Sequence, residues 1–372
     1  MLLVLALILL PITGCGTDTS KTSTEAASVS SLSESTEQKA QQIVLTDDVG
    51  REITLEKPLE KVVVFNKFNS EIIRALGKVD TIVGTDKNTL QDKQYWPGWT
   101  DEMKVAVNQK DIDFEKVAAL KPDAVILPSN GAYEDCIKNL ESFGIKTIVV
   151  TGWQNKSFAK QIDILGKAFG EEQKAQEYIA FCQAQVDMLS EKLENATPVS
   201  VYLENSGEYH SCLPGSGWND MITMGGGSNI FADVDIAKED QAKGSVHSFE
   251  VDREQIIERN PQAIFLNVYD SAATPGVSIY VAPDAEKLNQ ALKDMANRPG
   301  WNTIEAVKNG DVYGVSAFSG NGCFKIIGAT YIAKYLYPEE MKDVDPDAFF
   351  SEWLEKWQGV EFVPGHAGQL KA

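Results

Sequence analysis

The chain has 372 residues, of which 43% are hydrophobic, enough to build a core in each of two ordinary domains. This composition excludes a disordered or fibrous protein. Acidic residues outnumber basic residues by 54 to 34, and the formal net charge of -20 disfavours a nucleic-acid partner, because it would repel phosphate backbones.

An apolar stretch opens the chain and ends at a cysteine. Residues 2–12 are about half the roughly 20 residues that cross a bilayer, as in the core of a secretory signal. The run Ile12-Thr13-Gly14-Cys15 resembles a bacterial lipobox, in which the cysteine thiol receives a diacylglyceryl group. We therefore expect a signal peptide over residues 1–14, lipidation of Cys15, and a flexible, Ser- and Thr-rich tether over residues 15–42. No basic residue precedes the apolar core, so we expect the natural start a few residues earlier, or a missing basic segment.

Four further cysteines, Cys136, Cys182, Cys212 and Cys323, allow three disulfide pairings, and the sequence does not choose among them. Cys182 lies on an apolar helical stripe and is predicted to be a buried core thiol. Cys212 and Cys323 both lie in glycine-rich segments, so a bridge between them stays open.

Short β-branched runs alternate with helical patterns from residue 43 onward. This alternation predicts βαβ units and a largely parallel sheet. The expected strands are residues 61–65, 81–83, 123–127 and 146–150, with amphipathic helices at 70–76 and 114–120.

One long helix interrupts the alternation. Apolar residues keep helical spacing over residues 158–169 and again over residues 171–195, and the second stretch would span on the order of 37 Å at 1.5 Å per residue. We interpret it as a strut between two α/β halves, against the alternative of an ordinary surface helix. Beyond it the expected strands are 199–203, 263–267 and 311–315, and the expected helices 218–224, 253–258, 285–296, 326–335 and 349–357.

An internal repeat links the two halves. Residues 115–127 and 254–266 each begin with Glu, carry Pro seven residues later and then enter an apolar strand, with Ala and Leu at matching offsets. We therefore expect an α/β protein of two Rossmann-like lobes with largely parallel sheets, joined by a single long inter-lobe helix. The expected N-terminal lobe is 43–168, the connecting helix 169–196, the C-terminal lobe 197–338, and a C-terminal helix and tail 339–372.

Several segments carry a resemblance to a known family. Over roughly residues 43–338 the chain resembles the extracytoplasmic substrate-binding proteins of ABC importers, of the helical-backbone type that carries iron–siderophore, haem or cobalamin-like ligands. The segments are Phe65-Asn66-Lys67-Phe68-Asn69-Ser70-Glu71, the two repeat copies, Pro299-Gly300-Trp301, Asp311-Val312-Tyr313, and residues 47–55, which resemble the family's N-terminal hairpin.

The resemblance implies a transport role. Such a protein captures an iron complex (siderophore or haem) or a corrinoid between its lobes and delivers it to an ABC permease dimer with its ATPase. Glu115 and Glu254 match the acidic pair, one on each lobe, that meets permease arginines in the cobalamin-binding member, and two similar contacts suit a two-fold permease. Each is also favoured in a first helical turn by the helix dipole. Together with the lipid on Cys15, this implies a monomer anchored to the outer face of the cytoplasmic membrane, without a cofactor of its own.

In the family the cleft is lined by loops at the carboxyl ends of the strands. Here those loops are residues 65–68, 95–96, 108–109, 129–133, 209–218, 246–248, 269 and 318–324. Their aromatic, amide and glycine residues suit a bulky ligand with flat and polar faces, although any single aromatic is more often a core residue than a ligand contact. The candidate ligand contacts are Phe65, Asn66, Lys67, Phe68, Tyr95, Trp96, Asn108, Gln109, Tyr133, Tyr209, His210, Trp218, His247, Ser248, Tyr269, Phe318, Asn321 and Phe324.

Two kinds of polar residue bear on the ligand's chemistry. His247, or else Tyr209 or His210, is a candidate axial ligand for the metal of a bound haem or corrinoid, although a lone histidine is usually structural. Lys67 and Lys87 are the basic candidates for an anionic ligand, while the arginine clusters typical of ferric-hydroxamate or citrate binders are not evident.

Three other functions compete with import. An extracellular hydrolase is disfavoured, since the chain has no HExxH, GxSxG, GxxxxGK[ST] or CxxC pattern. A zinc or manganese receptor needs about three converging ligands, and the only histidines are His210, His247 and His366. A surface sensor or receptor of the same fold stays open, because no residue distinguishes it from a transport protein.

Overall fold

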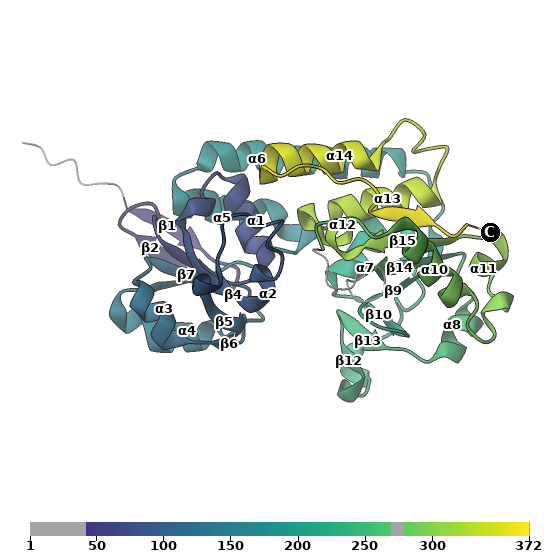
Figure 1. The fold of residues 1–372 in the computed structure, drawn as a ribbon, viewed down its shortest axis with the longest axis horizontal. Coiled ribbons are helices and arrows are strands. Elements are labelled where there is room, and N and C mark those ends of the chain that lie inside the picture. The colour runs from purple at the N-terminus through teal and green to yellow at the C-terminus, as the bar shows by residue number, and fades with distance from the viewer. Residues whose placement is uncertain (1–41, 269–278, 372) are drawn as a thin grey trace, which may run out of the picture. The chain divides into compact units, whose positions relative to one another are not determined.

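The computed structural model describes residues 42–268 and 279–371 (Figure 1). The expected signal peptide, Cys15 and almost all of the tether lie outside the described residues, as does Tyr269. Within the described ranges, no helix is both long and apolar enough to cross a membrane.

The N-terminal lobe is built on a six-stranded sheet in the order β6-β5-β4-β3-β7-β8. All neighbours are parallel except β5 and β6, as the alternation predicted. The strands are β3 (Val62–Val64), β4 (Ile82–Asp86), β5 (Lys104–Asn108), β6 (Asp111–Ile112), β7 (Ala124–Leu127) and β8 (Lys146–Val149), and β1 (Ile43–Thr46) and β2 (Glu52–Leu55) form the expected antiparallel hairpin.

Helices cover both faces of this sheet because its central strands are apolar throughout. Val62 and Val64 pack in one cluster with side chains of α1 (Lys67–Ala75) and α5 (Phe158–Phe169). Val63 packs on the opposite face, with side chains of α3 (Phe114–Leu120) and α4 (Tyr133–Leu140). A short helix, α2 (Lys87–Leu90), follows β4.

The C-terminal lobe repeats this plan with a five-stranded sheet in the order β11-β9-β14-β15-β16. Only the edge strand β16 is antiparallel to its neighbour. The strands are β9 (Val199–Glu204), β11 (Gly227–Asn229), β14 (Ala263–Val268), β15 (Val312–Ser316) and β16 (Ala367–Gln369), and β10 (His210–Ser211), β12 (Gly244–Ser245) and β13 (Ser248–Glu250) form a small separate sheet.

The helices of this lobe also cover both faces of its sheet. Tyr202 and Ile264 pack in one cluster with Leu292 of α10, and Val201 and Phe265 pack in the other, which includes side chains of α7 and α13. The helices are α7 (Gly217–Met224), α8 (Arg253–Arg259), α10 (Ala285–Ala296), α11 (Glu305–Asn309), α12 (Ala317–Asn321), α13 (Ile326–Leu336) and α14 (Pro346–Glu352).

The repeat seen in the sequence is also a repeat of backbone geometry. Helix α3 leads into β7, and α8 leads into β14, so the two copies belong to different sheets. Each helix ends on a left-handed residue, Lys121 with φ 51° or Asn260 with φ 44°, directly before the proline. Since proline disfavours the α conformation in the residue before it, both helices end at the same point.

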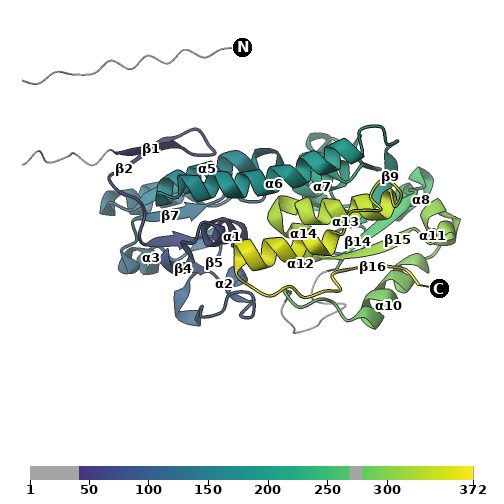
Figure 2. The same cartoon turned by 90° about the horizontal axis from the view of Figure 1, so that it is seen from above.

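The connecting helix is α6 (Glu172–Lys192), whose 21 residues span about 31 Å. Figure 2 shows it alongside α5 at one end and extending toward α7 and β9. It contacts the C-terminal lobe through Gln185, whose Nε2 donates to Thr330 Oγ1 of α13 at 3.0 Å. The predicted helix over residues 169–196 is therefore confirmed as an element, although its ends lie a few residues further in.

Residues 346–358, which we call the α14 segment, form a second connection between the lobes. Helix α14 continues into a π-helical turn, Trp353–Gln358. Trp353 Nε1 donates to Tyr178 Oη of α6 at 2.9 Å, and Gln358 Oε1 accepts from Arg74 Nε of α1 at 2.9 Å. The chain then returns to the C-terminal sheet as β16 (Figure 1). The expected C-terminal tail therefore packs against both lobes.

The four described cysteines are buried thiols. Cys182 is fully buried in the core, as its position on an apolar stripe predicted. Cys182 Sγ lies 3.5 Å from Cys323 Sγ, whereas Cys212 contacts Asn229. The neighbour of Cys323 is thus Cys182 and not Cys212.

We expect Gly166→Ala to destabilise the protein, although alanine is the better helix former. A β-carbon at Gly166 would lie 2.5 Å from Cβ of Ala175, where α5 packs on α6. Helix propensity alone predicts a gain of about 1 kcal/mol, but overpacking costs about 1–3 kcal/mol. Urea unfolding should therefore show a net loss.

The matched control is the double variant Gly166→Ala with Ala175→Gly, which moves the methyl group to the other helix. It should recover most of the lost stability. A stabilised single variant would show that α5 and α6 do not approach this closely.

Candidate functional site

A pocket of about 200 Å³ is lined by residues of both lobes. Phe68, Asn130 and Trp153 come from segments that follow β3, β7 and β8, so they lie at the carboxyl ends of three adjacent parallel strands. Such edges are where open α/β sheets bind ligands. The lining residues are Phe68, Asn130, Trp153, Gly217, Trp218, His247, Asn321 and Lys325, and we call this set the cleft pocket.

Aromatic side chains form much of the cleft pocket. The rings of Phe68 and Trp153 meet edge to face, with centroids 5.9 Å apart and an interplanar angle of 62°. Trp218, on the first turn of α7, contributes from the other lobe and is 6% exposed. These side chains offer flat apolar surfaces of the kind that stack on conjugated or aromatic ligands.

Lys325 is the most unusual residue of the cleft pocket. Its side chain is 3% exposed, and its Nζ donates to Asn321 Oδ1 at 2.9 Å. The ammonium group also lies 4.4 Å from the centroid of the Trp218 ring, a cation–π distance. Burial, aided by the positive charge of Lys67, lowers the pKa of Lys325 to about 7.

His247 also lines the cleft pocket, and its surroundings favour the neutral imidazole. Its Nδ1 lies 3.1 Å from Ser216 Oγ. Burial lowers the pKa of His247, and the charge of Lys325 lowers it further. Because an uncharged imidazole is the form that ligates metals, the site is compatible with the axial role considered above. Tyr209 and His210 lie away from this pocket; Tyr209 packs beside Arg298 and Trp301, and His210 Nδ1 contacts Glu208 O.

The structure brings four of the expected contacts, Phe68, Trp218, His247 and Asn321, into the cleft pocket. Lys67 lies beside it, with its Nζ 5.4 Å from the centroid of the Phe68 ring. Lys87 is exposed at the start of α2.

Five expected contacts are buried core residues instead. Phe65 directly follows β3 and lies inside the N-terminal core, and Phe324 packs on Phe158 and Tyr178. Tyr95 and Phe318 pack against each other with centroids 4.8 Å apart. Their loops do lie at strand ends, but aromatic side chains there fill the junction between lobes. The five are Phe65, Tyr95, Trp96, Phe318 and Phe324, all at most 4% exposed.

The remaining expected contacts do not line the cleft pocket. Asn66 caps α1 by accepting from the Asn69 backbone N–H, and Asn108 closes the β5–β6 turn beside Gln109. Tyr133 begins α4, and Ser248 begins β13. The polar groups of Asn66 and Asn108 thus serve a local cap and a local turn and do not line this pocket.

Two lining residues lie outside the loops named from the sequence, Trp153 and Lys325. Trp153 comes shortly after the predicted strand that became β8, so the rule used for the other loops would have found it. Lys325 directly precedes the apolar helix α13, and only its basic charge at that point signalled a role.

The two expected docking residues occupy equivalent positions in the two lobes. Glu115 is exposed in the first turn of α3, and Glu254 is exposed in the first turn of α8. Glu254 Oε1 accepts from Arg253 Nε at 2.8 Å. Both carboxylates are therefore available at the surface.

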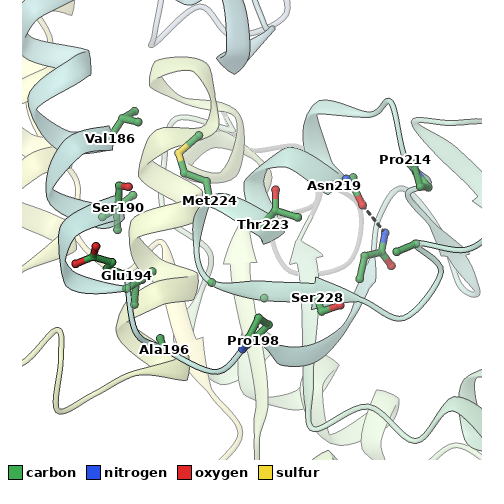
Figure 3. Close-up of a pocket in the computed structure, with 16 residues that line it drawn as sticks. Val186, Ser190, Glu194, Ala196, Pro198, Pro214, Asn219, Thr223, Met224 and Ser228 are labelled. Carbon is green, nitrogen blue, oxygen red and sulfur yellow. Dashed lines mark hydrogen bonds between the residues drawn. The ribbon is translucent and has the colours of Figure 1, made fainter.

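A larger cavity of about 840 Å³ lies between α6, α7 and β11 (Figure 3). It is lined by side chains such as Val186, Met224 and Ser228, and Asn229 Nδ2 donates to Asn219 Oδ1 at 3.0 Å at its edge. It contains no expected contact. Over residues 42–268 and 279–371, no cluster of three or more His, Cys, Asp or Glu residues is arranged to hold a metal ion.

Comparisons of the sequence and of the fold with known proteins indicate the same family. The family described as periplasmic binding protein matches residues 62–317. An uncharacterised ABC transporter substrate-binding lipoprotein, YvrC of Bacillus subtilis, is 27% identical over 81% of this chain and 87% of its own. A vitamin B12-binding protein of Vibrio campbellii is 25% identical over 67% of this chain and 87% of its own. Among solved structures, the TroA-like periplasmic binding protein FepB of Veillonella parvula has a TM-score of 0.69 and 26% identity, covering 88% of this chain and all of that one.

Proposed function

Because this chain belongs to the periplasmic binding protein family, we propose that it captures an iron complex or a corrinoid in the cleft pocket and delivers it to an ABC importer. The observation that carries this proposal is the pocket itself, to which both lobes contribute at the carboxyl ends of their strands. A ligand held there contacts both lobes at once. The B12-binding relative supports a corrinoid, and the aromatic walls suit either class.

The partners in this proposal are a permease dimer with its ATPase and the membrane. Glu115 and Glu254 would dock on the two permease subunits, one for each lobe. Cys15 would carry the lipid that holds the protein at the outer face of the cytoplasmic membrane. The proposal includes a monomer, since one chain supplies both lobes and both docking residues.

Cleft closure is expected to be small. Helix α6 and the α14 segment both connect the lobes, and helices bend little, which disfavours a wide hinge motion. Small-angle scattering with and without ligand should give nearly the same radius of gyration. A large compaction on binding would contradict this mechanism.

We expect the ligand to quench tryptophan fluorescence, because Trp153 and Trp218 line the pocket. The protein, purified without refolding, is first examined by absorbance and mass spectrometry for coloured material that co-purifies. Haemin, cyanocobalamin and ferric siderophore complexes are then titrated against ligand-free protein. Trp153→Ala should weaken binding about tenfold or more, because it removes one aromatic stacking contact and the apolar surface buried with it.

Trp99→Phe is the matched control, since Trp99 stacks on Trp96 with centroids 4.4 Å apart and does not line the cleft pocket. It should leave the affinity unchanged. Failure of every complex to bind wild-type protein would exclude the proposed ligand classes.

A further inference from the structure

The cleft pocket holds a positive charge without an ion-pair partner among the described residues, although Glu71 and Asp220 act on it at longer range. Lys325 forms no ion pair among the described residues, and its one hydrogen bond goes to an amide oxygen. The ring of Trp218 supplies further contact at 4.4 Å. Burying an ammonium group without such a partner is costly. The chain has 54 acidic residues, but within the described ranges none is placed to form an ion pair with Lys325.

The backbone around Lys325 has an energetically unfavourable conformation. Cys323, Phe324 and Lys325 have φ values of 45°, 55° and 67°, so three consecutive non-glycine residues lie in the left-handed region. Each such residue costs on the order of 1–2 kcal/mol. Phe324 anchors this turn, because its ring packs on Phe158 of the N-terminal lobe at 5.6 Å between centroids. Strain of this kind concentrates at binding sites.

A glycine makes room for the Lys325 side chain. A β-carbon at Gly217 would lie 3.1 Å from Cε and 3.3 Å from Cδ of Lys325, so a larger residue there would push the lysine aside. The turn and the glycine together fix the path of the side chain into the pocket.

A second lysine approaches from the other lobe. Lys67, the first residue of α1, places its Nζ 5.4 Å from the Phe68 ring centroid, and Lys325 Nζ lies 5.4 Å from that same centroid. Lys67 Nζ also lies 5.2 Å from the centroid of the Phe318 ring. Lys67 likewise forms no ion pair within the described ranges. Two ammonium groups, one from each lobe, thus share one aromatic ring.

We propose that Lys67 and Lys325 form a pair of cationic anchors and that the ligand is an anion with a flat conjugated surface, which stacks on Phe68, Trp153 and Trp218. This inference rests on the proposed function and narrows it. A ligand with negative charge offsets the repulsion between the two lysines as it enters, and is then held by both lobes without a large movement of either. Anionic ferric catecholate complexes and haem have the required chemistry; neutral hydroxamate complexes do not.

The anchor is pH-dependent. Because the pKa of Lys325 is about 7, its charge in the empty protein is largely present at pH 6 and largely absent at pH 8.5, and affinity for an anion should fall across that interval. Burial and the charge of Lys325 lower the pKa of His247, which favours its neutral form. The other ionisable groups that act on Lys325 are Lys67 and Glu71 of α1, Asp220 of α7, and Cys212; Asp220 is paired with Lys156 at 2.7 Å.

The test compares probes of different charge on full-length protein. The probes are a trianionic ferric complex of a hexadentate tris-catecholate, haemin, a neutral ferric trihydroxamate of similar size, cyanocobalamin and molybdate, each followed by tryptophan quenching or calorimetry. We expect an anionic conjugated probe to bind about tenfold or more tightly than the neutral ones. Lys67→Met and Lys325→Met should each weaken that probe about tenfold, and the double variant about 100-fold.

Three comparisons separate the charge from other effects. Lys138→Met, at an exposed lysine of α4, should change nothing. Gly217→Ala should weaken the anionic probe without removing any charge. Lys325→Met should also abolish the fall in affinity between pH 6 and pH 8.5.

The outcomes distinguish this inference from the function on which it rests. Equal affinity for neutral and anionic complexes, or lysine variants with unchanged affinity, would overturn the anionic ligand while leaving import in place. Binding of molybdate alone would overturn the flat conjugated surface. Binding of none of the probes would overturn the proposed ligand classes, and the inference with them.

Discussion

Replacing Glu115 and Glu254 together by arginine should reduce ligand uptake by cells roughly 100-fold or more, while ligand binding by the purified protein stays unchanged. Both side chains are exposed in the first turns of the two repeated helices. Neither lines the cleft pocket. The reversed charges would face permease arginines as like charges, which costs several kcal/mol at an interface.

The control reverses the charge of two other glutamates that lie in first helical turns but outside the internal repeat. Glu102, in the first turn of a 3-10 helix of the N-terminal lobe, and Glu286, in the first turn of α10, are both exposed. The double variant Glu102→Arg with Glu286→Arg changes the net charge equally and should leave uptake intact. Loss of uptake in both double variants would indicate a general charge effect, and loss of ligand binding in the first would place Glu115 or Glu254 at the ligand.

Lys325→Met should make the ligand-free protein more stable, by about 2 kcal/mol at pH 6. The pKa of Lys325 is about 7 in the folded protein, against the model-compound value of 10.5. A shift of that size corresponds to roughly 5 kcal/mol as an upper bound. The hydrogen bond to Asn321 and the ring contacts that methionine loses offset part of the gain.

The effect has a defined pH window. Between pH 7 and 10.5 the unfolded chain binds a proton that folded Lys325 does not, so the stability of wild-type protein rises with pH across this interval. Conversely, it falls as pH is lowered from 10.5 to 7. The advantage of Lys325→Met should therefore be largest at or below pH 7 and shrink toward pH 10, as measured by urea unfolding at fixed ionic strength.

Lys138→Met serves again as the comparison, since an exposed lysine should shift stability by no more than about 0.5 kcal/mol at any pH. A Lys325→Met protein that is destabilised at pH 6 would mean that the ammonium group contributes to folding and is not reserved for a ligand.

Much of the fold was predictable because its signals are local. The runs around Val62, Ala124 and Ala263 are apolar on both faces, which only a covered parallel sheet requires. The matched Glu and Pro positions predicted two similar lobes, and the left-handed residues before Pro122 and Pro261 confirm that the match is structural. The helices at 114–120 and 285–296 coincide with α3 and α10.

Other elements were not predictable, since their stability comes from distant partners. Strand β16 has the sequence Ala-Gly-Gln and becomes a strand by pairing with β15. Strand β5 has exposed side chains at Lys104 and Val107, its first and fourth residues, so its burial pattern does not alternate as in a typical strand. The contacts of the α14 segment with α1 join residues nearly 290 positions apart, beyond any periodicity argument.

The sequence indicated where the cleft pocket lies better than it indicated which residues line it. Strand ends indicated Phe68, Trp218, His247 and Asn321, which line the cleft pocket. They also pointed to Tyr95 and Phe318, because an aromatic residue at a strand end fills a lobe junction as readily as it contacts a ligand. The position of the Lys325 side chain depends on a left-handed turn formed by non-glycine residues. Because such residues rarely adopt this conformation, no local sequence pattern indicates it.

The α14 segment also bears on how the protein folds. Gln358 accepts from Arg74 and Trp353 donates to Tyr178, contacts between residues 284 and 175 positions apart. Contacts of such large sequence separation carry a high loop-closure entropy, so we expect them to form late in folding. The N-terminal lobe then completes its packing only when the α14 segment docks on it, and a substitution in that segment weakens both lobes.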